Sequence, residues 1–207
     1  LHQKRQFDLC CTPNHDILTM DRGKVKASEF KAHPRIHIPI TGLRMDASRM
    51  SGLTPLERLR IAYAADGADI IGDNRTGERC GYQRVTLTLR KQRKINRLRV
   101  LCSEAGVTLG ELSRDKFTVD MPPGVTRTLA DWVDIGSVGH RWGREFIDEI
   151  LQWDGHISET GDRRIYCSTN KRDIDLAQAI ATMSGLSTTL TVSNDKRKST
   201  YKTYYRL

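Results

Sequence analysis

Two aspartates end apolar helical segments, at positions where a carboxylate is unfavourable. In REFIDEILQWDGHIS, residues 144–158, apolar side chains recur at steps of three and four residues before Asp154 is reached. In PLERLRIAYAADGADI, residues 55–70, a similar pattern ends at Asp66. A glycine follows each aspartate and indicates the end of the helix. Because the C-terminal end of a helix carries partial negative charge, each aspartate needs a cation nearby.

An isolated Asp-Gly pair is most often a surface turn, whereas two pairs that end matching helices indicate a shared site. If the helices pack side by side, both carboxylates and both negative helix ends converge. Divalent cations relieve such repulsion, and Mg²⁺ suits oxygen-rich sites because it keeps several waters and bridges to phosphates. A phosphodiester gripped by shared metals is the two-metal scheme of hydrolysis. We therefore expect Asp66 and Asp154 to bind Mg²⁺ or Mn²⁺ and to act in phosphodiester hydrolysis.

The segments around the two aspartates form an internal repeat of helix, two strands, helix and strand. The aspartates lie 88 residues apart, and the glycines that end the next helix of each half, Gly106 and Gly185, lie 79 residues apart. A longer hairpin loop in the first half accounts for the difference. The first helix begins with a predicted capping box, in which Thr54 is followed by a proline and by Glu57.

Alternating residues in the strand segments predict one buried and one polar face for each sheet. The residues expected to be buried are Val85, Leu87, Leu89, Phe117, Val119, Leu190 and Val192. The polar faces would follow the backbone of a nucleic acid, with selected side chains reading base edges in the major groove. The side chains expected to contact DNA are Arg84, Thr86, Arg90, Arg164, Tyr166, Lys198, Thr200, Lys202 and Arg206.

Composition favours a globular, basic protein with a polyanionic partner. The chain has 207 residues, 38% of them hydrophobic, which is enough for a sizeable core. Its 34 Lys and Arg against 25 Asp and Glu give a net charge of +9, so nucleic acid is the first candidate partner. The five cysteines show no CxxC pair, and neither a signal peptide nor a membrane-spanning run is found. We expect an intracellular protein, in a cytoplasm or in the host cell of a phage, and not a secreted one.

The aspartate segments resemble the motifs of single-chain LAGLIDADG (dodecapeptide) homing endonucleases. LRIAYAADG, residues 59–67, and IDEILQWDG, residues 147–155, match the motif in their apolar positions and in the final Asp-Gly. The resemblance implies an α+β fold in which two αββαββα halves, related by a pseudo-twofold axis, meet through the motif helices. It also implies a set of metal ligands, namely Asp66, Asp154 and the main-chain carbonyls of Ala65 and Trp153.

The same family places a basic residue near the metals. Lys116 and Lys202 lie on corresponding predicted strands, 50 residues after Asp66 and 48 residues after Asp154. The resemblance makes them the candidate catalytic lysines, although a solvated lysine or a contact to the DNA backbone would occupy the same positions.

The second motif departs from the family pattern at the helix interface. Small residues of this family let the two motif helices approach closely, and Ala62, Ala64 and Ala65 supply them in the first motif. In the second motif Glu149 and Ile150 stand where a glycine or another close-packing residue is expected. We therefore expect an asymmetric interface.

The first 45 residues are similar to part of a Hint (intein) domain. FDLCCTPNHDILTMDRGKVKASEF contains a Thr-x-x-His block, here Thr12 and His15, and a strand-turn-strand pattern. In inteins this histidine promotes the first acyl shift, which implies a splicing-related role for both residues. Leu1 is not a Cys or Ser nucleophile and TYYRL lacks a closing His-Asn, so we expect an internal section of an endonuclease-bearing intein or a degenerate relative, unable to splice by itself.

The sequence thus predicts a Hint-like all-β segment at 1–45, a first half at 54–120, a linker with a short helix at 121–140 and a second half at 141–207. The predicted function is site-specific cleavage of double-stranded DNA by a monomer with pseudo-dimeric halves, without a membrane partner and with host exteins if the chain is part of an intein. Two alternatives remain open: a non-cleaving nucleic-acid-binding maturase or regulator, and a splicing scaffold with a decayed endonuclease.

Overall fold

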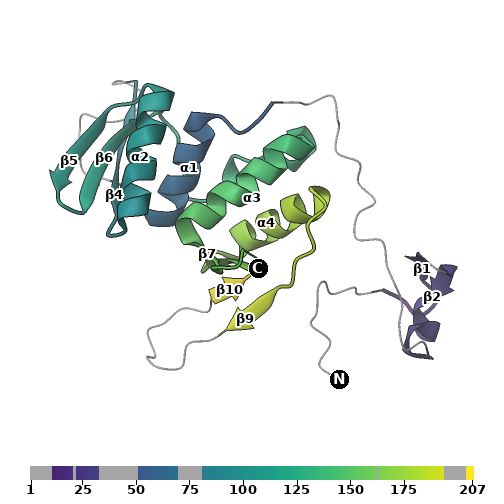
Figure 1. Cartoon of the computed structure of the whole chain (residues 1–207). Helices are drawn as coiled ribbons and strands as arrows, with labels where there is room; N and C mark the ends of the chain where they lie inside the picture. Colours follow the sequence, from purple (N-terminus) through teal and green to yellow (C-terminus); the bar gives the residue numbers. More distant parts are fainter. Residues whose placement is uncertain (1–10, 21, 33–50, 70–80, 162, 194–203) are drawn as a thin grey trace.

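The computed structural model of the chain describes residues 11–20, 22–32, 51–69, 81–161, 163–193 and 204–207 (Figure 1). Within these residues the fold is a mixed α/β arrangement of helices and antiparallel sheets. None of the helices that the structure describes is long and apolar enough to cross a membrane.

The first half of the repeat places two helices against an antiparallel sheet. Its elements are α1 (Pro55–Asp66), β3 (Gly67–Asp69), β4 (Gln83–Thr88), α2 (Gln92–Ala105), β5 (Leu109–Ser113) and β6 (Lys116–Met121). The sheet order is β3-β4-β6-β5, and β4 pairs with β6 in unbroken register from Gln83–Met121 to Thr88–Lys116.

The second half repeats this order. Its elements are α3 (His140–Asp154), β7 (Gly155–Ile157), β8 (Arg164–Ser168), α4 (Lys171–Met183), β9 (Thr191–Ser193) and β10 (Tyr204–Arg206). The sheet order is β7-β8-β10-β9, which matches the first sheet strand for strand. Between the halves lie the short 3-10 helices η3 (Leu129–Asp131) and η4 (Ile135–Ser137), and η3 confirms the short helix expected in the linker.

Local signals set the ends of the helices as predicted. Thr54 Oγ1 accepts a hydrogen bond from the Glu57 amide at 3.3 Å, and the Glu57 carboxylate accepts one from the Thr54 amide at 2.7 Å. This reciprocal pair is the capping box, which satisfies two amides that the helix leaves unpaired. Gly106 ends α2 with φ of 65°, a left-handed conformation that glycine adopts without steric penalty.

The buried faces of the sheets agree with the predicted alternation in the first half and only in part in the second. Val85, Leu87 and Leu89 are at most 1% exposed, and Phe117 and Val119 are buried with them. Buried residues of both halves form one continuous core, since α1 and α3 pack directly against each other (Figure 1).

Two residues expected to be exposed are buried, and one expected to be buried is exposed. Thr86 is buried, because its side chain lies along β3 and donates a hydrogen bond to the Ala68 carbonyl at 3.1 Å. Tyr166 is buried on β8, and Ile150 and Trp153 of α3 line a small pocket with it. Val192, expected in the core, is 59% exposed.

The N-terminal part contains one hairpin and one short helix among its described residues. β1 (Asp16–Thr19) pairs with β2 (Gly23–Lys26), so that Ile17 faces Val25, and η1 (Ala27–Ala32) follows. This agrees with the strand-turn-strand pattern, but a hairpin of this size does not establish a Hint domain.

Candidate active site

Asp66 and Asp154 converge at the point where α1 and α3 end. Both carboxylates lie within ion-pair distance of one ammonium group, that of Lys94 on α2. Lys94 Nζ donates a hydrogen bond to Asp66 Oδ2 and lies 3.7 Å from Asp154 Oδ1. Two acidic residues that lie 88 positions apart in the chain therefore share the Lys94 ammonium as an ionic partner.

The glycine after each aspartate permits the chain to turn back against its own helix. Gly67 and Gly155 have extended backbones, with φ of −87° and −105°, so neither requires a left-handed conformation. A Cβ atom at Gly67 would lie 2.1 Å from the Tyr63 ring, and one at Gly155 would lie 2.4 Å from the Leu151 Cα. Each Asp-Gly pair thus ends a helix and starts a strand within one residue, and this fixes the aspartate at the end of the helix.

The N-terminal end of α2 supplies the positive charge that these aspartates need. Lys91 is the N-cap of this helix and Arg93 and Lys94 lie in its first turn, where the helix dipole adds further positive potential. Arg93 donates a hydrogen bond to the main-chain carbonyl of Gln152, near the end of α3. A helix N-terminus of the first half therefore faces a helix C-terminus of the second half.

The surroundings of Asp154 make its carboxyl harder to ionise than that of an ordinary aspartate, because its pKa is raised. Burial raises the pKa of the Asp154 carboxyl, and the charge of Asp66 raises it further, while Lys94 and Lys91 lower it by a smaller amount. A carboxylate pair that one ammonium does not fully neutralise is a cation-attracting site.

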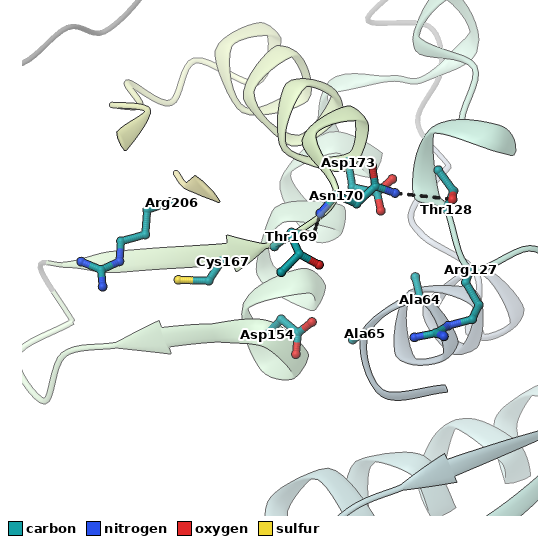
Figure 2. A pocket seen from close by; sticks show the side chains of 11 residues that line it. Ala64, Ala65, Arg127, Thr128, Asp154, Cys167, Thr169, Asn170, Asp173 and Arg206 are labelled. Atoms are coloured by element: carbon teal, nitrogen blue, oxygen red, sulfur yellow. Dashed lines mark hydrogen bonds between the residues drawn. The ribbon is translucent and has the colours of Figure 1, made fainter. Parts of the chain in front are cut away.

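An open cavity of about 500 Å³ lies on the Asp154 side of the pair (Figure 2). It is bounded by the end of α1 at Ala64 and Ala65, by β8 and by the first turn of α4. Its polar lining comprises Arg127, Thr128, Asp154, Ser168, Thr169, Asn170, Asp173 and Arg206.

Asp173 occupies the place in α4 that Lys94 occupies in α2, the third residue after the N-cap. It is buried, and its Oδ1 accepts a hydrogen bond from the Ala130 amide at 3.1 Å. Burial raises the pKa of the Asp173 carboxyl against the effect of its backbone hydrogen bonds. The two halves therefore present opposite charges at equivalent positions beside the aspartate pair.

Among the residues expected beside the metals, Ala65 lines the cavity, whereas Trp153 is buried and donates from Nε1 to Glu149 at 3.0 Å. Lys116 is exposed at the start of β6 and pairs with Thr88, and Gly67 pairs with the preceding Leu87. Lys116 is thus level with Asp66 along the strand direction, but the main chains of the two residues are separated by two strand spacings, about 10 Å. Lys202 lies outside the described residues.

The residues expected to contact DNA are not a single exposed set. Arg84 is engaged by Asp120 on the neighbouring strand through two hydrogen bonds of 2.6 and 2.9 Å. Arg90, Arg164 and Arg206 are exposed, and Arg164 pairs with Asp148 on α3 at 2.9 Å. Thr86 and Tyr166 are buried, and Lys198, Thr200 and Lys202 lie outside the described residues.

Thr12 and His15, assigned to splicing from sequence, lie in an exposed turn before β1. The His15 amide donates to the Thr12 carbonyl at 3.0 Å, and the His15 carbonyl accepts from Ala27 at 2.9 Å. These contacts are those of a turn that starts a hairpin.

Sequence reasoning missed Lys94. A signal was present, since KQRK at 91–94 puts three basic residues at the start of a predicted helix. Positive charge is unfavourable at a helix N-terminus, just as the negative charge of Asp66 and Asp154 is unfavourable at the C-termini of their helices. The two anomalies compensate each other.

Comparisons with known proteins give a partial fold likeness and one distant relative. No protein-family model matches the chain. The ribonucleoside-diphosphate reductase subunit beta of Aquifex aeolicus (strain VF5) is 26% identical over an alignment of 245 residues. The alignment covers all of this chain and 35% of that protein, so the chain spans about a third of the relative's length.

Similar solved structures include the homing endonuclease I-DmoI. Its complex with DNA and Mn superposes with a TM-score of 0.44 at 14% identity, covering 73% of this chain and 86% of that chain. Its complex with DNA and Ca gives 0.48 at 12% identity, covering 75% and 83%. The likeness is partial, at identities where residue roles do not transfer, and neither comparison supports a Hint domain at residues 1–45.

Proposed function

We propose that this chain is a divalent-metal-dependent endonuclease of the LAGLIDADG type that cleaves both strands of double-stranded DNA at a specific site. The observation that carries the proposal is the convergence of Asp66 and Asp154 at two neighbouring helix ends, held against one ammonium group. Apolar or neutral residues at these helix ends would stabilise the fold better than two partly buried carboxylates do. The pair therefore indicates a functional role.

The donor set suits Mg²⁺ or Mn²⁺. Among the described residues no group of three or more His, Cys, Asp and Glu side chains could hold a metal on its own. Two carboxylates, with the Ala65 and Trp153 carbonyls as further oxygen donors, leave positions for water and phosphate, which is how Mg²⁺ is commonly bound. When bound, the cation would polarise a water and the scissile phosphate.

The surroundings of Asp154 suit a phosphodiester backbone. Arg127 and Arg206 line the cavity on opposite sides of Asp154, and the Arg127 side chain extends toward the cavity whereas the Arg206 guanidinium extends away from Asp154 (Figure 2). The Arg127 guanidinium would hold a phosphate against the cation and offset the charge that develops on its oxygens. Arg90, Arg164 and Lys116 are exposed and would extend the contact along the strand faces, consistent with a net charge of +9.

We further propose that the endonuclease is carried within an intein, with residues 1–45 as part of the splicing domain and with Thr12 and His15 in it. An inserted segment would align with part of a protein named for its host, and the reductase subunit matches this chain over 35% of its own length. Purified chain joined to that host's flanking sequences would yield ligated flanks if splicing capacity is retained, and uncut fusion if it is not.

A second candidate function is non-cleaving DNA binding on the same fold. The Lys94 ammonium favours it, because a built-in cation at the aspartate pair could remove the need for a metal. Cleavage assays separate the two functions.

The test is cleavage of a randomised double-stranded DNA library with Mg²⁺ by the wild type and by the Asp66→Asn and Asp154→Asn variants. Asp175→Asn, an exposed carboxylate on α4, is the matched control. Products that disappear in both site variants but persist in the control would support the proposal. Equal cleavage by all four proteins would refute it, and binding without products would favour the second candidate.

A further inference from the structure

The position of Lys94 is electrostatically demanding. Its side chain is only 9% exposed, although it carries a full charge in the first turn of α2. A buried ammonium is tolerated only when it is paired. Both of its described ionic partners are the proposed metal ligands, Asp66 and Asp154.

The ammonium does not stand midway between the two aspartates. It is hydrogen-bonded to Asp66 and 3.7 Å from Asp154 Oδ1, and the Asp66 side chain is 22% exposed against 35% for Asp154. Asp154 lines the open cavity, whereas Asp66 does not. The first-half aspartate is thus already neutralised, and the second-half aspartate still faces solvent.

The equivalent position in the second half reinforces this difference. A second lysine at that place would neutralise Asp154 as Lys94 neutralises Asp66, but the residue there is Asp173, which lines the same cavity as Asp154. At the third position after the N-cap, the first half therefore has a positive residue that is hydrogen-bonded to Asp66, and the second half has a negative residue in the cavity of Asp154.

We propose that the Lys94 ammonium takes the place of one of the two divalent cations, so that the aspartate pair binds a single divalent cation, on the Asp154 side. This inference rests on the proposed role of Asp66 and Asp154 as metal ligands.

Charge counting gives the reason. The two carboxylates and Lys94 together carry one negative charge, and one divalent cation brings the group to a single positive charge. A second would raise it to three positive charges in a partly buried site, which is strongly unfavourable. A second cation therefore has to displace Lys94 from Asp66, and that would leave a buried ammonium without its partner.

The test is Mn²⁺ binding to the DNA-free protein, measured by equilibrium dialysis and by electron paramagnetic resonance of free Mn²⁺. The Asp66→Asn/Asp154→Asn double variant gives the background of unrelated surface sites. Lys94→Met removes the charge and keeps the buried aliphatic stem, and Lys91→Met removes an equal charge from the same helical turn. Lys94→Gln replaces Lys94→Met if circular dichroism shows that the methionine variant does not fold.

We expect one Mn²⁺ above background for the wild type, lost in Asp154→Asn. Lys94→Met should bind a second Mn²⁺, with at least about a tenfold gain in affinity for it, because the competing charge at contact distance is gone. Lys91→Met should bind as many Mn²⁺ ions as the wild type, since Lys91 acts on Asp154 through its charge and, unlike Lys94, not through a hydrogen bond.

Two Mn²⁺ ions on the wild type, or the same single site in Lys94→Met, would overturn the inference and leave the proposed metal site intact. A gain in Lys91→Met equal to that in Lys94→Met would also overturn it, because general electrostatics would then be sufficient. No Mn²⁺ above background in any of these proteins would overturn both the inference and the proposed function.

Discussion

Replacing Glu149 with glutamine should destabilise the protein more than any other single loss of a carboxylate at the α1–α3 interface. Glu149 is 1% exposed in the middle of α3. It accepts hydrogen bonds from Arg58 of α1 at 2.7 Å, from Arg97 of α2 at 2.5 Å and from the Trp153 indole at 3.0 Å. Three helices therefore meet at one carboxylate, in the second motif where a small residue was expected.

The expected loss is about 3 kcal/mol. Removing one partner of a buried ion pair costs about 3–5 kcal/mol. Glutamine keeps the volume and one acceptor oxygen, and Arg58 and Arg97 are 19% and 34% exposed and can regain some water. The lower end of the range therefore applies, which corresponds to a fall in Tm of roughly 6–12 °C for a chain of this size.

Urea unfolding followed by tryptophan fluorescence measures this loss. Glu145→Gln is the matched control: Glu145 also pairs with Arg58, but it is 26% exposed, so its loss should be near 1 kcal/mol. A loss below 1 kcal/mol for Glu149→Gln, or one no larger than that of the control, would refute the reasoning.

The pH dependence gives a second check. Burial raises the pKa of the Glu149 carboxyl, but the hydrogen bonds from Arg97 and Arg58 outweigh it and hold the pKa below its ordinary value of 4.5. The stabilisation is therefore complete above pH 4.5 and is lost as the pH falls through the lower pKa of the folded state. The difference between wild type and Glu149→Gln should shrink over that acid range and stay constant above it.

Three further outcomes follow from the site and the helix ends. Asp154→Asn should raise the free energy of unfolding at pH 7 while abolishing cleavage, because the pKa of the Asp154 carboxyl is raised in the folded state, so that its ionisation destabilises the fold. This gain should be absent below the unfolded-state pKa of 3.8, should grow as the pH rises from there to the higher pKa of the folded state, and should be constant above it; a lower stability at pH 7 would contradict this. Thr54→Ala should cost about 1 kcal/mol in thermal unfolding through loss of the capping box, and an unchanged Tm would contradict it. Gly106→Ala should cost about 1 kcal/mol in urea unfolding, because alanine is strained at a φ of 65°; a stabilised variant would show that the helix end shifts.

Helix ends and the first sheet could be predicted because their signals are local. Thr54 with Glu57 defines the start of α1 within one turn, and Gly106 defines the end of α2 through its own backbone. In β4 the apolar positions Val85 and Leu87 are separated by polar residues, so the buried face is unambiguous. The convergence of the aspartates followed from the repeat, since equivalent helix ends meet across a pseudo-twofold axis.

The burial of the other strand residues and the position of Lys94 depend on packing between elements, which the alternation of apolar and polar residues does not specify. In β8 we assigned Tyr166 to the exposed face together with the polar residues of the strand. Its phenol ring is instead buried against α3, so this face of β8 is the one that packs on the helix. Thr86 shows that a polar residue can be buried when a neighbouring strand offers a carbonyl. Lys94 could not be placed at the site from the repeat, because the second half has Asp173 there.

The Glu149 cluster also determines which surfaces can pair. By the offset of the two motifs, Ile61 stands where Glu149 stands in the second half, so two copies of the first half would set Arg58 and Arg97 against isoleucine. Both guanidinium groups would lose the carboxylate that they share in the present interface.

Two copies of the second half would be worse matched. Phe146 and Leu176 occupy the positions of Arg58 and Arg97, so each Glu149 carboxylate would be enclosed by apolar side chains with no cation. The two repeated halves therefore have different interface surfaces. Each surface is complementary to that of the other half and not to a second copy of itself. If the two halves were produced as separate chains, they would assemble only as a heterodimer.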